Sequence, residues 1–84
     1  MKQFRTLAKQ VELDFSNCDQ DDLDIIEVKP KNSMGYSFIG LFVGINKGKI
    51  LFQQFKNDKD SIFDVEWNEV SKKDKPTILK YLIN

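Results

Sequence analysis

The sequence predicts an α+β fold, a small antiparallel β-meander of about four strands with an N-terminal and a C-terminal helix, in the order α-β-β-β-β-α. Three observations support it. Apolar residues recur at helical spacing near both ends of the chain, alternating apolar runs fill its middle, and short polar breaks separate those runs. Consecutive strands joined by short turns pair antiparallel, and amphipathic helices then cover one face of the sheet.

The first element is a helix over residues 3–11. Over residues 3–15, the apolar positions have spacings of 3, 1, 3 and 4, which fit one face of a helix: Phe4, Leu7, Ala8, Val11 and Phe15. Because positions 11, 13 and 15 also alternate, residues 12–15 fit either a helix or a strand, and both stay open. Residues 16–24 are polar and acidic and predict a loop.

The predicted strands cover residues 24–29, 35–45, 49–55 and 62–67. Pro30 lacks a backbone donor and ends the first of them. Between the second and third, Asn46-Lys47-Gly48 is typical of a three-residue hairpin loop, a type I turn followed by a left-handed Gly48. In the fourth, Phe63, Val65 and Trp67 alternate with acids, which indicates one buried and one wet face.

The chain ends in a helix that starts at residue 74 or 75, because Pro76 is tolerated only in a first turn. Ser71 or Asp74 is expected to cap it, in a motif that resembles a capping box. Four residues make its apolar stripe: Ile78, Leu79, Leu82 and Ile83.

The hairpin over residues 36–55 carries apolar residues on both of its faces, although helices are expected to cover only one. One face of its first strand is expected to carry the apolar odd positions Ile39, Leu41, Val43 and Ile45. The other carries Tyr36, Phe38 and Phe42 beside two glycines, Gly40 and Gly44, which indicate a bulge or a close backbone approach. Either the N-terminal helix covers this second face, or the face is a patch for a partner or a second copy of the chain.

The size and composition of the chain limit the functions that it can have. Residues 1–84 are enough for one compact domain with a modest core, and the formal net charge is zero. No apolar run approaches the ~20 residues of a membrane span, and the first residues lack the apolar stretch of a signal peptide. With a single cysteine, Cys18, these features predict a cytoplasmic protein that is not held in a membrane.

The sequence contains few of the residue patterns that catalysis requires. The chain has no histidine, which removes the commonest general base and the commonest metal ligand. One cysteine cannot build a structural zinc site, and the glycines do not form a phosphate-binding loop. We therefore expect no catalytic residues, no cofactor and no metal, and interpret the protein as a non-enzyme.

Charge is segregated along the chain despite the neutral total. Residues 12–27 hold seven acids and no base, whereas residues 29–59 hold six lysines and one acid. The acids at Asp19, Asp21, Asp22 and Asp24 are one candidate surface for a basic partner. The alternative is that the opposite charges face each other within the fold.

The favoured function is that of a non-catalytic protein-binding domain, such as an adaptor, a modulator or an inhibitor. Self-association of the chain is one form of this function. Tyr36, Phe38 and Phe42 are its candidate contacts, with the acids as a second surface. The alternative is a single-stranded nucleic-acid-binding protein that uses Lys47, Lys49 and Lys56 beside strand aromatics. An enzyme ranks third.

Overall fold

A five-stranded antiparallel sheet forms the centre of the computed structural model, which describes residues 2–82. Strand β3 (Phe38–Asn46) is its longest member. On one edge β3 pairs with β2 (Ile25–Val28) and, further along, with the two-residue β1 (Leu13–Asp14). On the other edge it pairs with β4 (Lys49–Gln53), which pairs in turn with β5 (Ile62–Val65).

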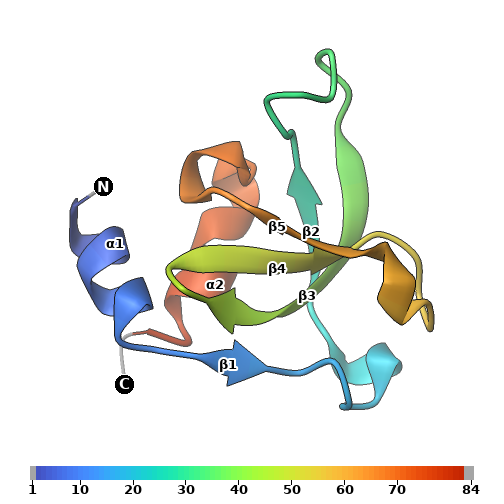
Figure 1. Cartoon of the computed structure of the whole chain (residues 1–84), viewed down its shortest axis with the longest axis horizontal. Coiled ribbons are helices and arrows are strands. Elements are labelled where there is room, and N and C mark those ends of the chain that lie inside the picture. Colours follow the sequence, from blue (N-terminus) through green and yellow to red (C-terminus); the bar gives the residue numbers. More distant parts are fainter. Residues whose placement is uncertain (1, 83–84) are drawn as a thin grey trace.

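Short helices complete the fold (Figure 1). Helix α1 (Lys2–Lys9) lies beside the β3–β4 turn, and α2 (Lys75–Leu79) lies behind the sheet in this view. Four 3₁₀ helices stand in the connections: η1 (Gln20–Asp22), η2 (Lys59–Ser61), η3 (Trp67–Glu69) and η4 (Lys72–Asp74). The expected α+β class, the antiparallel sheet and a helix at each end are confirmed.

The sheet curls because the chain after β5 returns to β2. Val70 forms an antiparallel bridge with Val28. On either side of it, Lys29 N donates to Glu69 O at 2.7 Å and Ser71 N donates to Glu27 O at 2.9 Å. The radius of gyration, 11.9 Å, is close to the roughly 12 Å expected for a compact chain of this length.

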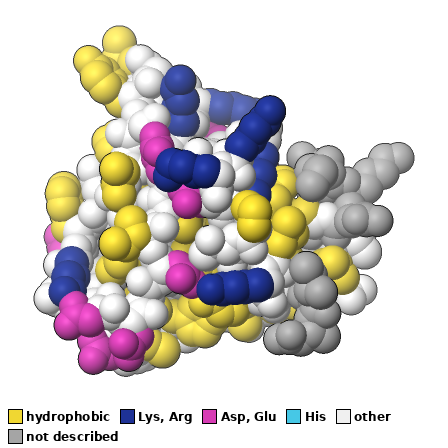
Figure 2. Space-filling model, turned by 180° about the vertical axis from the view of Figure 1, so that it is seen from behind, with side chains coloured by type: hydrophobic (Ala, Val, Ile, Leu, Met, Phe, Trp, Pro, Cys, Tyr) yellow, Lys and Arg dark blue, Asp and Glu magenta, His cyan; other side chains and the backbone are white. Residues whose placement is uncertain are grey.

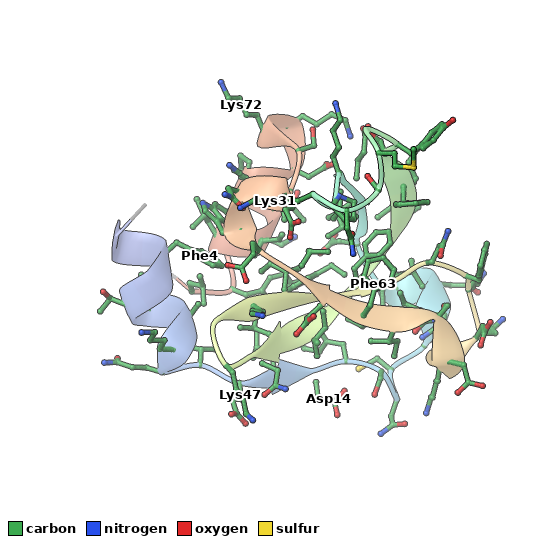
Figure 3. All side chains as sticks on the ribbon, turned by 45° about the horizontal axis from the view of Figure 1, so that its top comes forward. Phe4, Asp14, Lys31, Lys47, Phe63 and Lys72 are labelled. Carbon is green, nitrogen blue, oxygen red and sulfur yellow. The ribbon has the colours of Figure 1, made fainter. Side chains whose placement is uncertain are left out.

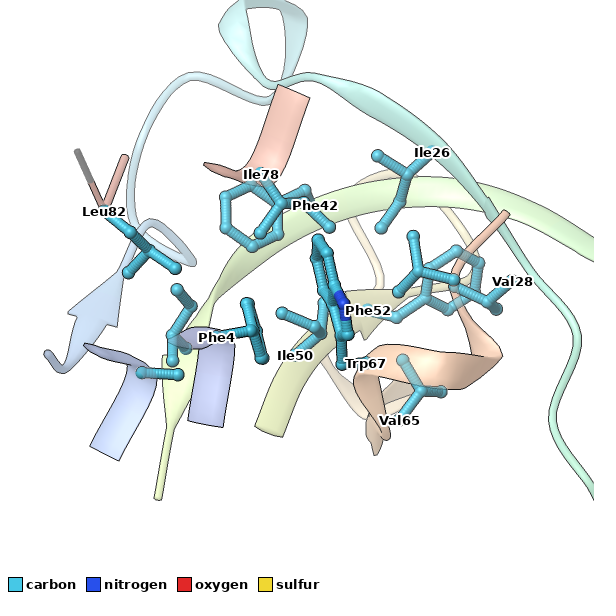
Figure 4. Close-up of a cluster of buried hydrophobic side chains, with 13 residues drawn as sticks. Phe4, Ile26, Val28, Phe42, Ile50, Phe52, Val65, Trp67, Ile78 and Leu82 are labelled. Carbon is cyan, nitrogen blue, oxygen red and sulfur yellow. The ribbon is translucent and has the colours of Figure 1, made fainter. Parts of the chain in front are cut away.

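The core fills the concave side of this curled sheet (Figure 4). Phe4 from α1 stacks on Trp67 from η3, with ring centroids 4.0 Å apart. Strand residues Phe42 and Phe52 and helix residue Ile78 pack into the same cluster and are almost fully buried. The helices and η3 therefore cover one face of the β3–β4 hairpin.

The segment from β1 to η1, which the sequence left as an open alternative and a loop, runs along the edge of β3 and reaches β4. Phe15 N donates to Val43 O at 2.8 Å, and the Gln20 side chain accepts from Gln53 Nε2 at 2.6 Å. Leu41 and Val43 are buried there. The second face of the hairpin, which carries Phe42, is therefore the core face, and the N-terminal helix contributes Phe4 and Ala8 to its cover.

The expectation that Ile39, Leu41, Val43 and Ile45 share one face is wrong. The β3–β4 register shifts between Phe42 and Gly44, which marks a bulge. The extra residue reverses the alternation, so Ile45 joins Phe42 in the core. Gly44 is required at this point because its φ is +152° and a Cβ there would lie 2.0 Å from Leu13 O.

Two further details differ from the expectations. The β3–β4 loop has two residues, Lys47 and Gly48, because Asn46 pairs directly with Lys49. Both have positive φ, 53° and 78°, as in a type I′ turn, whose twist matches that of the flanking strands. Helix α2 starts at Lys75 as expected, but neither Ser71 nor Asp74 caps it through its side chain.

Asp74 has another role, since its Oδ2 accepts a hydrogen bond from Glu27 N at 2.9 Å. Ile83, expected in the apolar stripe of the last helix, lies outside the described residues. Within residues 2–82, no helix has the length and apolar character required to cross a bilayer.

Candidate protein-binding surface

The connection between β2 and β3, residues 29–37, projects from the sheet as two successive tight turns (Figure 1). Ser33 N donates to Pro30 O, and Tyr36 N donates to Ser33 O, both at 3.1 Å. The Ser33 hydroxyl lies 2.6 Å from Pro30 O and 2.7 Å from Tyr36 O, so its one proton serves either carbonyl. Ser33 thereby joins the two turns into one unit.

The second turn holds its central residues, Met34 and Gly35, at positive φ values of 58° and 88°. This is the pattern of a type I′ turn, which favours Gly and Asn. A left-handed conformation costs a residue such as methionine about 1–2 kcal/mol. Burial of the Met34 side chain does not offset this free-energy cost, because the side chain is 91% exposed. Lys47 has a similar positive φ and is also exposed, so the feature that distinguishes Met34 is a bulky apolar side chain left in solvent.

The base of the loop is anchored to η3. Glu69 Oε2 accepts from Lys31 N at 2.7 Å, and its Oε1 accepts from Glu66 N at 2.6 Å. Together with the bond from Lys29 N to Glu69 O, these contacts fix the loop to the 3₁₀ helix that follows β5. A loop ordered in advance loses little conformational entropy on binding.

Below this loop, two isoleucines lie uncovered on neighbouring strands. Ile25 pairs with Leu41 and Glu27 pairs with Ile39, so Ile25 and Ile39 are diagonal neighbours on the same face of β2 and β3. They are 66% and 67% exposed. Leu41 beside them is buried, whereas both isoleucines are open to solvent.

We call the exposed side chains of Ile25, Met34, Tyr36 and Ile39 the apolar strip. Figure 2 shows hydrophobic side chains at the tip of the projecting segment and, below it, along the same side of the molecule. Scattered single apolar residues are normal on a protein surface, but here an exposed pair on adjacent strands lies on the same side of the molecule as two exposed residues of the projecting loop. The strip is the most distinctive apolar surface of the described residues.

Of the aromatic candidates, only Tyr36 lies on this surface, 70% exposed. Phe38 is half-buried and packs against the core. Phe42 is 1% exposed, so its assignment as a partner contact is corrected: it is a core residue. The reason is that α2 and the N-terminal segment cover its face, where Phe15 and Tyr81 lie 6.0 and 5.3 Å from its ring.

Most of the acidic candidates are engaged within the fold. Asp19 accepts from Asp21 N at 3.0 Å at the start of η1. Asp21 forms an ion pair with Lys56, and Asp24 accepts from Tyr81 Oη at 2.7 Å and lies 3.5 Å from Lys80 Nζ. Only Asp22 has no such side-chain contact among the residues described. These acids therefore serve mainly to hold connections in place.

The contact between Tyr81 and Asp24 changes the chemistry of the phenol. The hydrogen bond to the carboxylate, partial burial and the negative charge of Asp24 together raise the pKa of Tyr81 to about 12. Asp24 precedes β2 and Tyr81 follows α2, so this bond ties the segment after α2 to the start of β2.

The lysine candidates do not gather on one surface. Lys49 lies 3.4 Å from Glu66 and 4.0 Å from Asp64, and Lys56 is paired with Asp21. Lys47 is in the β3–β4 turn, whereas Lys56 lies beyond the other end of β4. Since β4 alone spans about 15 Å, one short stretch of backbone phosphates would not contact all three.

Sequence reasoning missed Ile25, Met34 and Ile39. Met34-Gly35 carried a weak signal, because a glycine after an exposed residue is typical of a tight turn. The isoleucines carried none, since the exposure of an apolar strand residue depends on which other segments of the fold lie over it. Within the described part of the chain, no cluster of carboxylates and cysteine is placed to hold a metal ion.

Comparison with known proteins identifies no relative of this chain. The chain matches no protein-family model, no curated protein and no solved structure.

Proposed function

We propose that this chain is a small non-catalytic protein-binding domain whose contact surface is the apolar strip. The observation that carries the proposal is Met34: a bulky apolar side chain, 91% exposed, on a left-handed backbone within an anchored turn. Exposed apolar patches of neighbouring residues are typical of interaction sites. Methionine suits such a role because its flexible side chain adapts to the partner's surface.

The shape of the strip indicates the kind of partner. Its loop end projects, so the receiving surface needs an apolar recess for Met34 and Tyr36. Its strand end is flat, so Ile25 and Ile39 require a flat apolar area beside that recess. Aromatic and methionine anchors of this kind are enriched at the centre of protein interfaces. Self-association remains a form of the same function if a second copy supplies the recess.

We further propose a reducing compartment, the cytoplasm, as its location. Cys18 is exposed with a free thiol, and exposed free thiols persist where the surroundings keep them reduced. Binding of single-stranded nucleic acid is the less supported alternative, because Lys49 and Lys56 contact acids of the same chain.

The experiment compares capture of proteins from the source cells by the tagged chain and by Ile39→Lys. Ile39 is exposed, so the substitution should change the free energy of unfolding by no more than about 0.5 kcal/mol. We expect at least a tenfold loss of the captured protein. Leu7→Lys on α1 is the matched control, because Leu7 is an exposed apolar residue outside the strip.

Two results would contradict the proposal. One is capture of the same proteins in equal amounts by all three chains. The other is no captured protein together with a monomeric mass at every concentration. If a labelled single-stranded oligonucleotide binds instead, and binding weakens steeply between 50 and 200 mM salt, the nucleic-acid alternative replaces it.

A further inference from the structure

A groove separate from the apolar strip runs between β5 and the base of loop 29–37. Its volume is about 720 Å³. One wall is the loop segment Pro30–Ser33, and the other includes the consecutive residues Phe63, Asp64, Val65 and Glu66. Figure 3 shows the Phe63 side chain between β5 and the loop segment that carries Lys31.

The wall formed by β5 is a free sheet edge. Strand β5 is the last in the sheet order and pairs only with β4. Among the described residues, the backbone groups of Phe63, Asp64 and Val65 make no hydrogen bonds outside that pairing. Because successive side chains on a strand point to opposite faces, a groove lined by four successive residues faces the backbone edge itself.

The floor of the groove is aromatic. Phe38 and Phe63 both line it and are half-buried, packed on one side against the core. Phe63 also contacts Phe52, with ring centroids 5.3 Å apart, which fixes its ring. An apolar side chain placed on this floor would therefore meet ordered aromatic surface rather than a mobile side chain.

The groove is lined by three acids and two lysines, Lys31 on the loop wall and Lys49 beside the acids of β5, so the β5 side is the acidic one. Asp64 and Glu66 share a single base, Lys49, at 4.0 and 3.4 Å. Glu69 also lines the groove, and both its carboxylate oxygens accept from backbone N–H groups rather than from a base. A basic side chain that reached the outer side of β5 would find a carboxylate without its own counter-ion.

We propose that this groove binds an extended peptide segment with alternating apolar and basic residues, which adds to β5 as a further strand. Its apolar side chains contact Phe38 and Phe63, and its basic side chains lie beside Asp64 and Glu66. The backbone edge supplies the main-chain hydrogen bonds, as in other cases of strand addition. Four lining residues correspond to about 13 Å of strand, so four or five peptide residues fit. This site does not depend on the apolar strip.

The probe is a capped heptapeptide of alternating lysine and valine, titrated into the ¹⁵N-labelled chain. We expect the largest amide shifts at residues 62–66 and at 30–33. Those amide protons of residues 63–65 that point away from β4 should exchange at least tenfold more slowly when the peptide is bound. The same peptide with alternating glutamate and valine should bind at least tenfold more weakly.

Asp64→Lys is the test variant, because the side chain is exposed and its loss does not disturb the core. It should weaken binding of the lysine–valine peptide at least tenfold, whereas Asp60→Lys, an exposed acid outside the groove, should not. Equal binding of both peptides, shifts confined to the apolar strip, unchanged exchange at residues 63–65, or the absence of any shift at millimolar peptide would each overturn the proposal. So would concentration-dependent pairing of β5 with a second copy that excludes the peptide.

Discussion

Met34 occupies a backbone conformation that an asparagine or glycine would adopt more easily, and nothing in the fold compensates for it. The substitution Met34→Asn should therefore raise the free energy of unfolding by about 1 kcal/mol, since asparagine tolerates the left-handed region. The same substitution should reduce partner capture at least fivefold. Urea denaturation and capture measured on the same preparations check both effects.

Lys47 provides the matched control, because it has a similar positive φ in the β3–β4 turn, away from the strip. Lys47→Asn should bring a comparable gain in stability and leave capture unchanged. Gain of stability with full capture by Met34→Asn would show that the Met34 side chain does not contact the partner.

Tyr81 makes stability depend on pH in the alkaline range. Its pKa is raised from 10.0 to about 12 in the folded chain. The unfolded chain therefore releases this proton first, so the contribution of Tyr81 is complete below pH 10 and is lost as pH rises through 12. Tyr81→Phe should lower the free energy of unfolding by about 1 kcal/mol at pH 8.

Phenolate absorbance and urea denaturation at pH 8, 10 and 12 check this prediction. The wild-type chain should show a titration step near pH 12 that Tyr81→Phe lacks, and the stability difference between the two chains should shrink over the same range. A stability difference that stays constant up to pH 12 would contradict the role given to the bond with Asp24.

At the scale of elements, the two-residue strand β1 depends on Gly44. A Cβ at this position would overlap the Leu13 carbonyl, so Gly44→Ala should destabilise the fold by about 3 kcal/mol and detach β1 from β3. Hydrogen exchange at residues 13–15 and 43–45 is the measurement. Gly35→Ala is the control, since it has positive φ but no atom within 4 Å of the added Cβ. It should cost only about 1 kcal/mol.

The regular elements were largely predictable, and the reason is local. The periodicity around Phe4 and Ile78 and the alternation of residues 62–65 are properties of short stretches, and these became α1, α2 and β5. The turn at Gly48 was predictable for the same reason. Its length was not, because the register of β3 and β4 selects two residues rather than three.

The bulge at Gly44 and strand β1 were harder to predict because both depend on distant parts of the chain. Gly44 signalled a bulge or a close approach, and it provides both, but the partner, Leu13, lies far away in sequence. Once the bulge reverses the alternation, the faces assigned to Leu41 and Ile45 separate. A single long-range contact thus decided which hydrophobic residues are core.

At the scale of the whole molecule, opposite charges that are segregated along the sequence partly pair within the fold. The acidic stretch before β2 contacts Lys56, Lys80 and Tyr81, which lie much later in the sequence. The segregation of charge was readable from the sequence, but the choice between a partner's surface and the chain's own lysines was not. The apolar strip, which consists of Ile25, Met34, Tyr36 and Ile39, stays exposed beside these paired charges.

The candidate site was therefore predictable only in part. Tyr36 was identified from the sequence, whereas Phe42, on the same predicted face, is buried. Whether an aromatic residue on a strand is core or contact depends on which segment lies over it. That coverage is a property of the complete fold: the helices cover the core face of β3, whereas Ile25 and Ile39 on the other face stay open.

The most direct test of the protein-binding proposal is photo-crosslinking in the source cells with p-benzoylphenylalanine placed at position 36 or, as a control, at position 9. Both residues are exposed, but Lys9 ends α1, far from loop 29–37 (Figure 1). The proposal predicts one or a few discrete protein adducts from position 36 and none of these from position 9. Identical adducts from both positions, or none from position 36, would contradict it.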